Sequence, residues 1–327
     1  MTVLINTVLG AIPSNRLGKT LIHEHFVFGY PGFQKYSGEK EFPWADALKH
    51  GIDMAERMQA RGVQTVVDPT PNECGRNPQL LKEIAESTGL QIICATGYYS
   101  ESKHSPEIYK LNQGSTQTED AIYELFRQEL RDGIGQTGIK AGVIKLASSK
   151  GLITDYETMF FRAAAKVQQE TGAIIITHTE GGTMGAEQAE LLQSNGADPH
   201  RVVIGHMCGN TNVRDHIRLL KAGFFTAFDR FGLDGVNGGS SDAERLALLI
   251  GLTGIGLADQ ILLSQDTVNY WLGRTTIKPG TPQKDRPNWY PTFLFDNIIA
   301  ILKNAGMSEA QIESFFVENP QRLFGAL

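Results

Sequence analysis

The fold is decided by three short apolar runs, AGVIKLASS (141–149), AIIITHT (173–179) and RVVIGHM (201–207). Each run carries a polar residue close to its end. The segments between the runs, roughly 156–171 and 185–194, have the apolar periodicity of helices. Short apolar runs that alternate with longer helical segments are typical of the βα units of a parallel sheet.

The same alternation continues on both sides of this stretch. Five further runs are KTLIHEHF (19–26), QTVVDPT (64–70), QIICATGYY (91–99), GFFTAFDRFG (223–232) and ILLSQD (261–266). Further helices are predicted at 44–61, 77–88, 119–132, 213–222, 241–252, 290–304 and 308–317. Eight units fit a closed barrel better than an open doubly wound sheet, which commonly has five or six strands and a Gly-rich first turn. We therefore predict a single (β/α)₈ TIM-barrel domain over residues 1–327.

Two segments lie outside these units. The residues before Lys19 indicate a small hairpin that caps the floor of the barrel. The longest irregular segment is 267–288, which contains Pro279, Pro282 and Pro287. Long loops in compact domains are often functional.

Composition excludes several classes of protein. The chain is 41% hydrophobic and 20% charged, and its net charge of -6 comes without a Lys/Arg cluster, which disfavours a nucleic-acid partner. The three cysteines are far apart and odd in number, so neither a disulfide framework nor a cysteine metal site is indicated. No signal peptide and no stretch of about 18 apolar residues is found, and we expect a cytoplasmic protein without a membrane partner.

Four of the eight histidines lie at the ends of predicted strands. Residues i and i+2 of a strand point to the same side, so His23 and His25 project together and Glu24 points away. An isolated pair of this kind is also explained by hydrogen bonds to loops. His178 and His206 bring two more imidazoles to the same rim, where barrel enzymes build their sites. The remaining four, at positions 50, 104, 200 and 216, need only a surface explanation.

Asp266 and Lys145 complete the candidate site. Asp266 closes a buried run, where an unpaired carboxylate is costly, so it is a metal ligand or, alternatively, a helix cap or loop anchor. Lys145 places an ammonium inside an apolar strand. Carbamylation by CO₂ turns this amine into an anionic group that can bridge two cations. The competing interpretation, a Schiff-base lysine, needs no histidine cluster. Four imidazoles, a modified lysine and an aspartate suit zinc, with cobalt, manganese or iron as substitutes.

The chain resembles the amidohydrolase superfamily, and within it the phosphotriesterase family and its phosphotriesterase-like lactonases. The resemblance rests on HEH (23–25), VIKLA (143–147), ITHTE (176–180), IGHM (204–207) and LSQD (263–266). It implies that His23, His25 and Asp266 hold a buried divalent ion and that His178 and His206 hold an exposed one. Carbamylated Lys145 and a hydroxide then bridge the two ions. A homodimer is usual in the family and is expected here on that ground alone.

Finer similarity points to the lactonases. Tyr99 occupies the place of a lactonase tyrosine, and Arg230 lies in FDRFGLD at the end of the seventh strand. Alternatively, Tyr99 is a rim aromatic and Arg230 forms a salt bridge to Asp229 or Asp234. Trp271 does not align securely with the aromatic residue of the lactonase loop.

We therefore expect a hydrolase that opens N-acyl-homoserine lactones and other γ- and δ-lactones by attack of the bridging hydroxide. The exposed ion would polarise the carbonyl with help from Tyr99, and Asp266 would carry the proton to the leaving alkoxide. Arg230 is the third candidate catalytic residue. Organophosphate hydrolysis is an expected side activity. The alternatives are a dedicated phosphotriesterase, a hydrolase of another carboxylic ester, and a barrel that only binds a ligand.

Overall fold

Eight parallel strands follow one another in space in the order in which they occur along the chain. This is seen in a computed structural model that describes residues 3–36, 42–103, 116–235, 239–274 and 284–325. The strands are β3 (Thr20–Leu21), β5 (Thr65–Asp68), β6 (Gln91–Gly97), β7 (Val143–Ser148), β8 (Ile174–Thr179), β9 (Val202–Ile204), β10 (Phe225–Phe228) and β11 (Ile261–Leu263).

The first and last strands of this series meet through their continuations. β4 (His25–Phe28) pairs in parallel with β12 (Val268–Trp271), and Val268 lies opposite His25. Two residues before this pair in each segment, the Asp266 N–H donates to the carbonyl oxygen of His23 over 3.1 Å. These contacts join the first strand to the eighth, which confirms the predicted (β/α)₈ barrel.

In two segments the predicted elements were wrong. The run 19–26 is interrupted at 22–24, so it forms two strands, β3 and β4, instead of one. The segment 267–288 was predicted to be irregular, but β12 lies at its start because the backbone there pairs with β4. Residues 275–283 of that segment lie outside the described residues.

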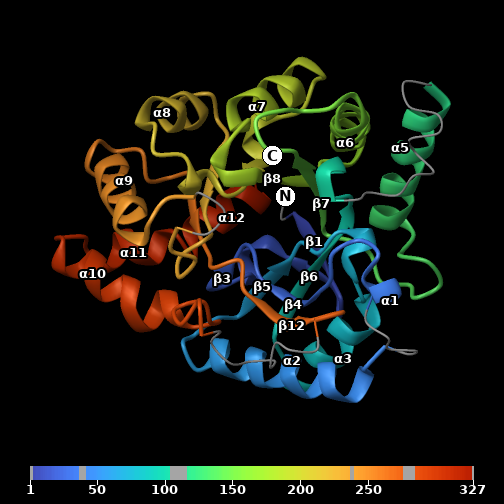
Figure 1. Cartoon of the computed structure of the whole chain (residues 1–327), viewed down its shortest axis with the longest axis horizontal. Helices are drawn as coiled ribbons and strands as arrows, with labels where there is room; N and C mark the ends of the chain where they lie inside the picture. The colour runs from blue at the N-terminus through green and yellow to red at the C-terminus, as the bar shows by residue number, and fades with distance from the viewer. Residues whose placement is uncertain (1–2, 37–41, 104–115, 236–238, 275–283, 326–327) are drawn as a thin grey trace.

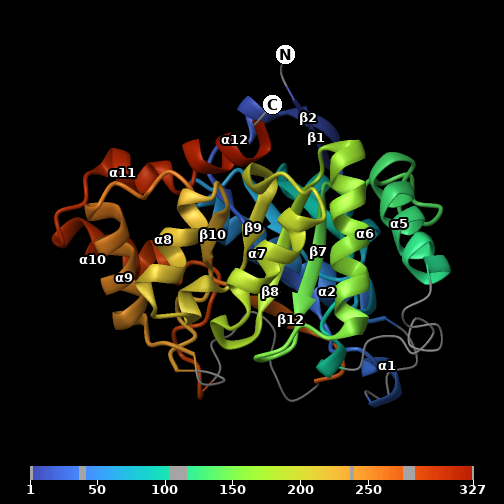
Figure 2. The same ribbon diagram turned by 90° about the horizontal axis from the view of Figure 1, so that it is seen from above.

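Helices surround the strands, as Figures 1 and 2 show from two directions. The helices are α1 (Phe33–Tyr36), α2 (Trp44–Gln59), α3 (Pro78–Thr88), α5 (Thr116–Arg131), α6 (Asp155–Thr171), α7 (Gly185–Ser194), α8 (Val213–Lys221), α9 (Asp242–Gly254), α10 (Ile299–Asn304), α11 (Glu309–Ser314) and α12 (Glu318–Gly325). Shorter helical segments are η1 (Ser14–Arg16), η2 (Asn72–Cys74), η3 (Glu101–Lys103), η4 (Glu180–Gly182), η5 (Pro199–Arg201), η6 (Met207–Gly209) and the π-helical η8 (Leu294–Ile298). Ser241 and Ser308 form capping boxes at the starts of α9 and α11. Within the described ranges, no helix has both the length and the apolar character needed to cross a bilayer.

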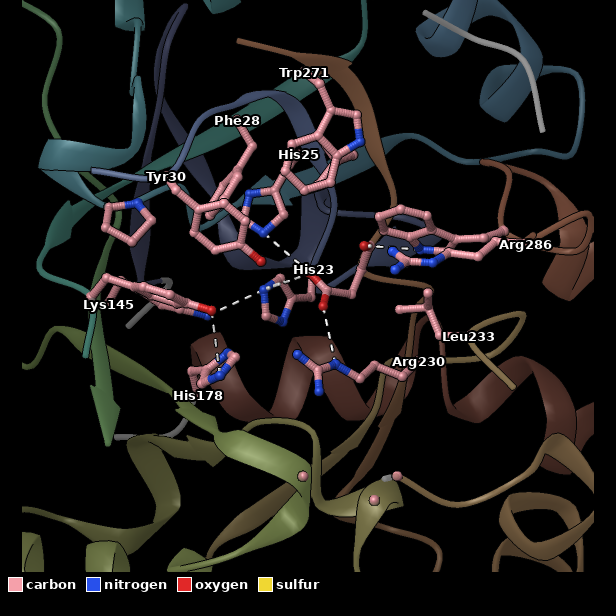
Figure 3. Close-up of a pocket in the computed structure, with 18 of the residues that line it drawn as sticks. His23, His25, Phe28, Tyr30, Lys145, His178, Arg230, Leu233, Trp271 and Arg286 are labelled. Atoms are coloured by element: carbon pink, nitrogen blue, oxygen red, sulfur yellow. Dashed lines mark hydrogen bonds and ion pairs between the residues drawn. The ribbon is translucent and has the colours of Figure 1, made fainter. Parts of the chain in front are cut away.

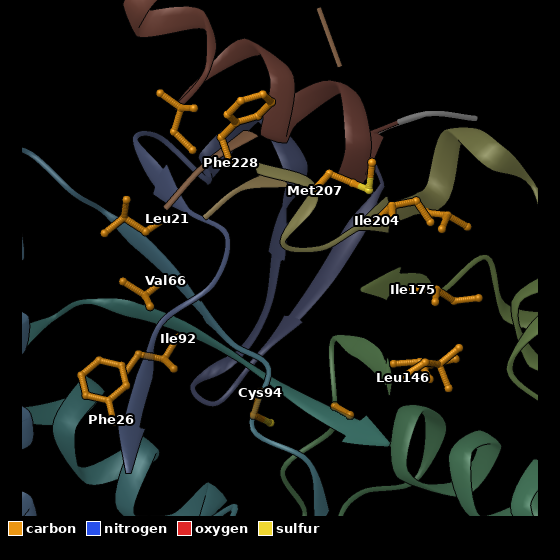
Figure 4. Packing of buried hydrophobic residues seen from close by; sticks show 14 of the residues in the cluster. Leu21, Phe26, Val66, Ile92, Cys94, Leu146, Ile175, Ile204, Met207 and Phe228 are labelled. Carbon is orange, nitrogen blue, oxygen red and sulfur yellow. The ribbon is translucent and has the colours of Figure 1, made fainter. Parts of the chain in front are cut away.

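Strand residues alternate between two apolar layers. Val66 and Ile175 belong to the layer between the strands and the helices, part of which Figure 4 shows. Their neighbours Val67 and Ile176 belong to a separate cluster that fills the inside of the barrel. The alternation of side chains along a strand therefore decides which residues reach the interior.

The floor of the barrel is covered as predicted. β1 (Leu4–Thr7) and β2 (Gly10–Pro13) form an antiparallel hairpin, and Ile5 of β1 joins the interior cluster together with Leu323 and Phe324 of α12. Both chain ends lie on this side, and α1 lies at the other end of the barrel (Figure 2). The carboxyl ends of the strands are left to form a site at the end away from the hairpin.

Candidate metal centre

Three residues of the site, two of them predicted ligands, enter the barrel because they continue the inward-facing series of their strands. In β7, Val143 faces the interior and Lys145 is the next residue with the same orientation. In β8, His178 follows Ile176 in the same way. Asp229 stands two residues beyond Ala227 of β10 and is fully buried.

The HEH motif lies where the first strand is interrupted. His25 begins β4, and Glu24 points away from the two histidines, as predicted. The Glu24 carboxylate accepts hydrogen bonds from the backbone N–H groups of Gln265 (2.8 Å) and Thr267 (2.9 Å), and from the Thr267 hydroxyl. These two residues flank Asp266, so Glu24 holds the backbone on both sides of a candidate ligand.

Two candidate ligands have left-handed backbone conformations. His206 has a φ of 57° and Asp266 a φ of 51°, and Met184 is the only other non-glycine residue with positive φ in the described part of the chain. Such conformations cost on the order of 1–3 kcal/mol each and are concentrated at functional sites. The fold therefore holds these two side chains in orientations that a relaxed strand end does not provide.

The six predicted ligands come together at the carboxyl ends of the strands, and Figure 3 shows four of them, His23, His25, Lys145 and His178. Asp266 is central: its oxygens lie 3.5 Å from Nε2 of His23, 3.2 Å from Nε2 of His25 and 3.7 Å from Nε2 of His206. Nζ of Lys145 lies 3.1 Å from Nε2 of His23. The ring of His178 is 4.5 Å from that of His206, centroid to centroid.

Asp229 orients two of the imidazoles. One of its oxygens lies 2.9 Å from Nδ1 of His23, and the other lies 2.9 Å from Nδ1 of His206. When Nδ1 of each ring donates its proton to this carboxylate, the lone pair of each Nε2 faces the centre, which is the tautomer that a metal ligand needs. Sequence reasoning missed this role of Asp229, although its place two residues beyond Ala227 was a usable signal.

The other two histidines also have polar partners that were not predicted. Nδ1 of His25 lies 2.7 Å from the hydroxyl of Thr70, which in turn donates to Asp68. Nε2 of His178 lies 3.2 Å from a carboxylate oxygen of Glu180. Thr70 and Asp68 close the QTVVDPT run, and only the fold brings that run beside His25.

Burial keeps most of the imidazoles neutral. It lowers the pKa of His23 to about 4, with a further contribution from Lys145, and it lowers the pKa of His178 to about 4. Burial, and then Arg230, also hold the pKa of His206 well below its usual value. His25 differs, because burial is outweighed by hydrogen bonds to Asp266 and Asp68, which raise its pKa. Neutral imidazoles are the protonation state that binds metal ions.

The anionic and amine groups complete a set that fits a divalent metal. Burial works against the charged form of Asp266, but its interactions with His23 and His206, its hydrogen bond to His25 and the charge of Arg230 outweigh burial and hold the pKa of this carboxyl well below its usual range. Burial lowers the pKa of Lys145 to about 8. Nε2 of His206 is buried without a hydrogen-bond partner. One ligand atom each from His23, His206 and Asp266 lie within 4.8 Å of one another, and an ion bound by His206 would satisfy this orphan nitrogen.

Tyr99 and Arg230 both line the pocket above these groups. The Tyr99 hydroxyl lies 3.5 Å from Nε2 of His178. Nε of Arg230 lies 3.2 Å from Oδ2 of Asp266. Arg230 therefore pairs with a candidate ligand, and the alternative salt bridge to Asp229 or Asp234 is not the one that the structure contains.

Two glycines allow neighbouring strands to approach closely at the site. A Cβ on Gly97 would lie 1.9 Å from the carbonyl oxygen of Lys145, and a Cβ on Gly205 would lie 2.0 Å from that of Thr177. Any larger residue would push the strand away, so the backbone beside Lys145 and before His206 requires glycine.

The four histidines outside the candidate site were predicted to need only a surface explanation, and the structure agrees with this for only some of them. His50 is partly buried and His200 is exposed, but His216 is fully buried, with Nε2 2.9 Å from the carbonyl oxygen of Asn210. The surface explanation was wrong for His216 because its helix face packs on Phe228 of β10. His104 lies outside the described residues.

Comparisons with known proteins extend over nearly the whole chain. The model of the phosphotriesterase family matches residues 3–324. An aryldialkylphosphatase from Saccharolobus solfataricus is 32% identical, and the match covers 96% of this chain and 97% of that protein. Two solved structures of variants from Deinococcus radiodurans are each 49% identical with a TM-score of 0.93. One is a PTE-like lactonase, covering 98% of this chain and 100% of that one; the other is an organophosphorus hydrolase, covering 99% and 98%.

Proposed function

Because the chain belongs to the phosphotriesterase family, we propose that it is a metal-dependent hydrolase that opens lactones and hydrolyses phosphotriesters more slowly. The substrates that we propose are N-acyl-homoserine lactones and other γ- and δ-lactones. The choice of lactones rests on the Tyr99 hydroxyl, which lies 3.5 Å from Nε2 of the candidate ligand His178 and lines the same pocket. The similarity to the Deinococcus radiodurans lactonase supports it.

The ligand set defines the metals that the site would hold. We assign one divalent ion to His23, His25 and Asp266, and a second to His178 and His206, with carbamylated Lys145 shared between them. Nitrogen and oxygen ligands of this kind suit zinc, and cobalt, manganese and iron are the alternatives. When bound, such ions lower the pKa of a coordinated water from about 16 towards about 7 and polarise a carbonyl oxygen.

Lys145 has the chemistry that carbamylation requires. Only the neutral amine has the lone pair that attacks CO₂. A pKa of about 8 leaves a substantial neutral fraction at physiological pH, whereas an ordinary lysine is almost wholly protonated there. The new N–C bond releases a proton and leaves one negative charge. The side chain is only 1% exposed, so this charge stays among the candidate ligands.

Asp266 can carry the proton of the reaction, and Arg230 holds the Asp266 carboxylate in place. Asp266 is ionised, so it can accept a proton from the attacking water and later deliver it to the alkoxide that leaves the acyl carbon. In a lactone this alkoxide remains attached, and the product is a hydroxy acid. Arg230 binds Oδ2 of Asp266, while Oδ1 faces His23 and His25. The carboxylate is thereby fixed in a position from which it can both bind metal and transfer a proton.

Tyr99 and an aromatic wall formed by Phe28, Trp271 and Trp289 can bind the substrate. Burial holds the pKa of the Tyr99 phenol well above its usual value, so the hydroxyl keeps its proton and can donate to the carbonyl oxygen of an ester. Beside it, the rings of Phe28 and Trp271 pack edge to face with their centroids 5.7 Å apart, and the ring centroids of Trp271 and Trp289 are 6.2 Å apart. This apolar wall can bury an acyl chain.

A dedicated phosphotriesterase is the second candidate function. The aryldialkylphosphatase from Saccharolobus solfataricus, which is 32% identical over almost the whole chain, favours it. A hydrolase of another carboxylic ester on the same scaffold is the third. All three use the same ligands and differ in what the pocket wall accepts.

Lactone and paraoxon turnover on one metal-loaded preparation tests the ranking. We expect kcat/KM for an N-acyl-homoserine lactone to exceed that for paraoxon by at least about 100-fold, or ~2.7 kcal/mol in the barrier. The reason is that Tyr99 and the aromatic wall are placed to bind a planar ester with a chain. Fast paraoxon hydrolysis with negligible lactone turnover would reverse the ranking in favour of a phosphotriesterase.

A further inference from the structure

The mouth of the pocket carries cations that the proposed reaction does not use. Arg274 and Arg286 both line the pocket, along with Arg230 and Arg245. Asp266 is the only acidic side chain among the described residues that line it. The positive side chains therefore outnumber the negative ones in the described lining of the pocket.

Arg274 is held by aromatic rings. It lies just beyond β12, with its guanidinium carbon 4.5 Å from the centroid of the Trp271 ring and 5.2 Å from that of Tyr30. The two rings are 6.0 Å apart. Cation–π contacts of this kind fix the plane of a guanidinium while leaving the N–H groups at its edge free to donate.

The arginines of the pocket differ in how their charge is used. Arg230 pairs with Asp266 at 3.2 Å, and Arg245 pairs with Asp242 at 2.6 Å. Arg274 is exposed, and within the described ranges no carboxylate pairs with it. Its positive charge is therefore available to a ligand.

Arg286 repeats the arrangement on the neighbouring indole. Its guanidinium carbon lies 5.6 Å from the centroid of Trp289, and the Trp289 and Trp271 rings are 6.2 Å apart. The only carboxylate that the described structure places near it is that of Asp285, at 3.8 Å and 74% exposed. An exposed pair at this distance is weak, so Arg286 can also turn to an anion.

We propose that Arg274, assisted by Arg286, forms an anion-binding subsite at the pocket mouth, and that the preferred substrate is a lactone whose side chain ends in a carboxylate or a phosphate. The inference rests on the proposed function, because it concerns the part of the substrate farthest from the ester. The lactone ring lies at the candidate ligands, the chain lies along the aromatic wall, and its anionic end meets the two guanidinium groups, which bind carboxylate and phosphate through paired N–H donors.

The experiment compares matched ligands that differ only at the end of the side chain. Two γ-lactones of equal chain length carry a methyl or a carboxylate terminus, and a third carries a phosphate. For the metal-loaded wild type we expect kcat/KM for either anionic lactone to be about tenfold that for the methyl lactone, equivalent to ~1.4 kcal/mol. In Arg274→Gln this ratio should fall to about one, mainly through KM, and in Arg274→Lys to an intermediate value because the bidentate fork is lost.

A distant arginine provides the matched control. Arg131 on α5 is 45% exposed and pairs with Glu170, so Arg131→Gln removes the same charge away from the pocket. This variant should keep the wild-type ratio. The ratio should also decrease as NaCl is raised from 50 to 500 mM, because salt screens an exposed charge pair.

Binding of the corresponding lactams, which resist hydrolysis, separates this inference from the proposed function. By calorimetry the anionic lactams should bind the wild type about tenfold more tightly than the methyl lactam, and equally in Arg274→Gln. Equal affinities in the wild type, or a preference that survives in Arg274→Gln, would overturn the subsite. Failure to hydrolyse any of the lactones would refute the proposed function, and the lactam affinities would still decide the subsite.

Discussion

Lys145→Ala is expected to lower lactone turnover by at least about 1,000-fold, or ~4 kcal/mol in the barrier, and to release bound metal. The reason is electrostatic. Lys145 is buried 3.1 Å from Nε2 of His23, and two divalent ions bound beside it, as proposed, would be compatible only with an anionic form of its side chain. Without the proposed carbamate, the alanine side chain would have no group to neutralise and bridge two ions. Steady-state kinetics and metal analysis of the purified variant check this result.

A second substitution separates chemistry from packing. Lys145→Met keeps most of the volume of the side chain but has no amine to react with CO₂, so it should lose as much activity as Lys145→Ala while unfolding closer to the wild-type temperature. Full activity in either variant would refute the role of Lys145.

Asp266→Asn is expected to lower kcat by at least about 1,000-fold with only a small change in fold, since the amide has nearly the shape of the carboxylate. Asp266 lies within 3.7 Å of the Nε2 atoms of three histidines and is held in its ionised form. The amide cannot accept the proton from the attacking water, and it leaves Arg230 without an ionic partner. Kinetics, metal content and circular dichroism of the variant are the measurements.

Asp215→Asn is the matched control for this loss. Asp215 lies on α8 and accepts hydrogen bonds from Asn210 and Asn212, away from the candidate ligands. It should retain the activity of the wild type. A value of kcat for Asp266→Asn close to that of the wild type would show that another group carries the proton.

The positions that could be predicted from the sequence are those governed by strand periodicity. Lys145 and His178 enter the barrel because the inward series of β7 and β8 runs straight to them, and this series is visible in the letters VIKLA and IIITHT. The order of the eight strands was predictable for the same reason, since consecutive βα units are neighbours in a barrel.

The features that could not be predicted depend on contacts between distant parts of the chain. Asp229 binds the rings of His23, which is 206 residues away, and His206. The left-handed backbone of Asp266 is maintained by neighbours such as Glu24, and no pattern in the sequence around Asp266 predicts this conformation. β12 was missed because its pairing with β4 exists only once the barrel has closed.

The proposed centre holds two divalent ions that depend on carbamylated Lys145. Its most direct test is the metal content of the wild-type chain after removal of metal and reconstitution with zinc and bicarbonate, measured by mass spectrometry alongside lactone turnover. We predict two zinc ions per chain, with activity recovering in proportion to occupancy and more slowly without bicarbonate. Fewer than one tightly bound ion per chain, even with bicarbonate present, would contradict the binuclear centre.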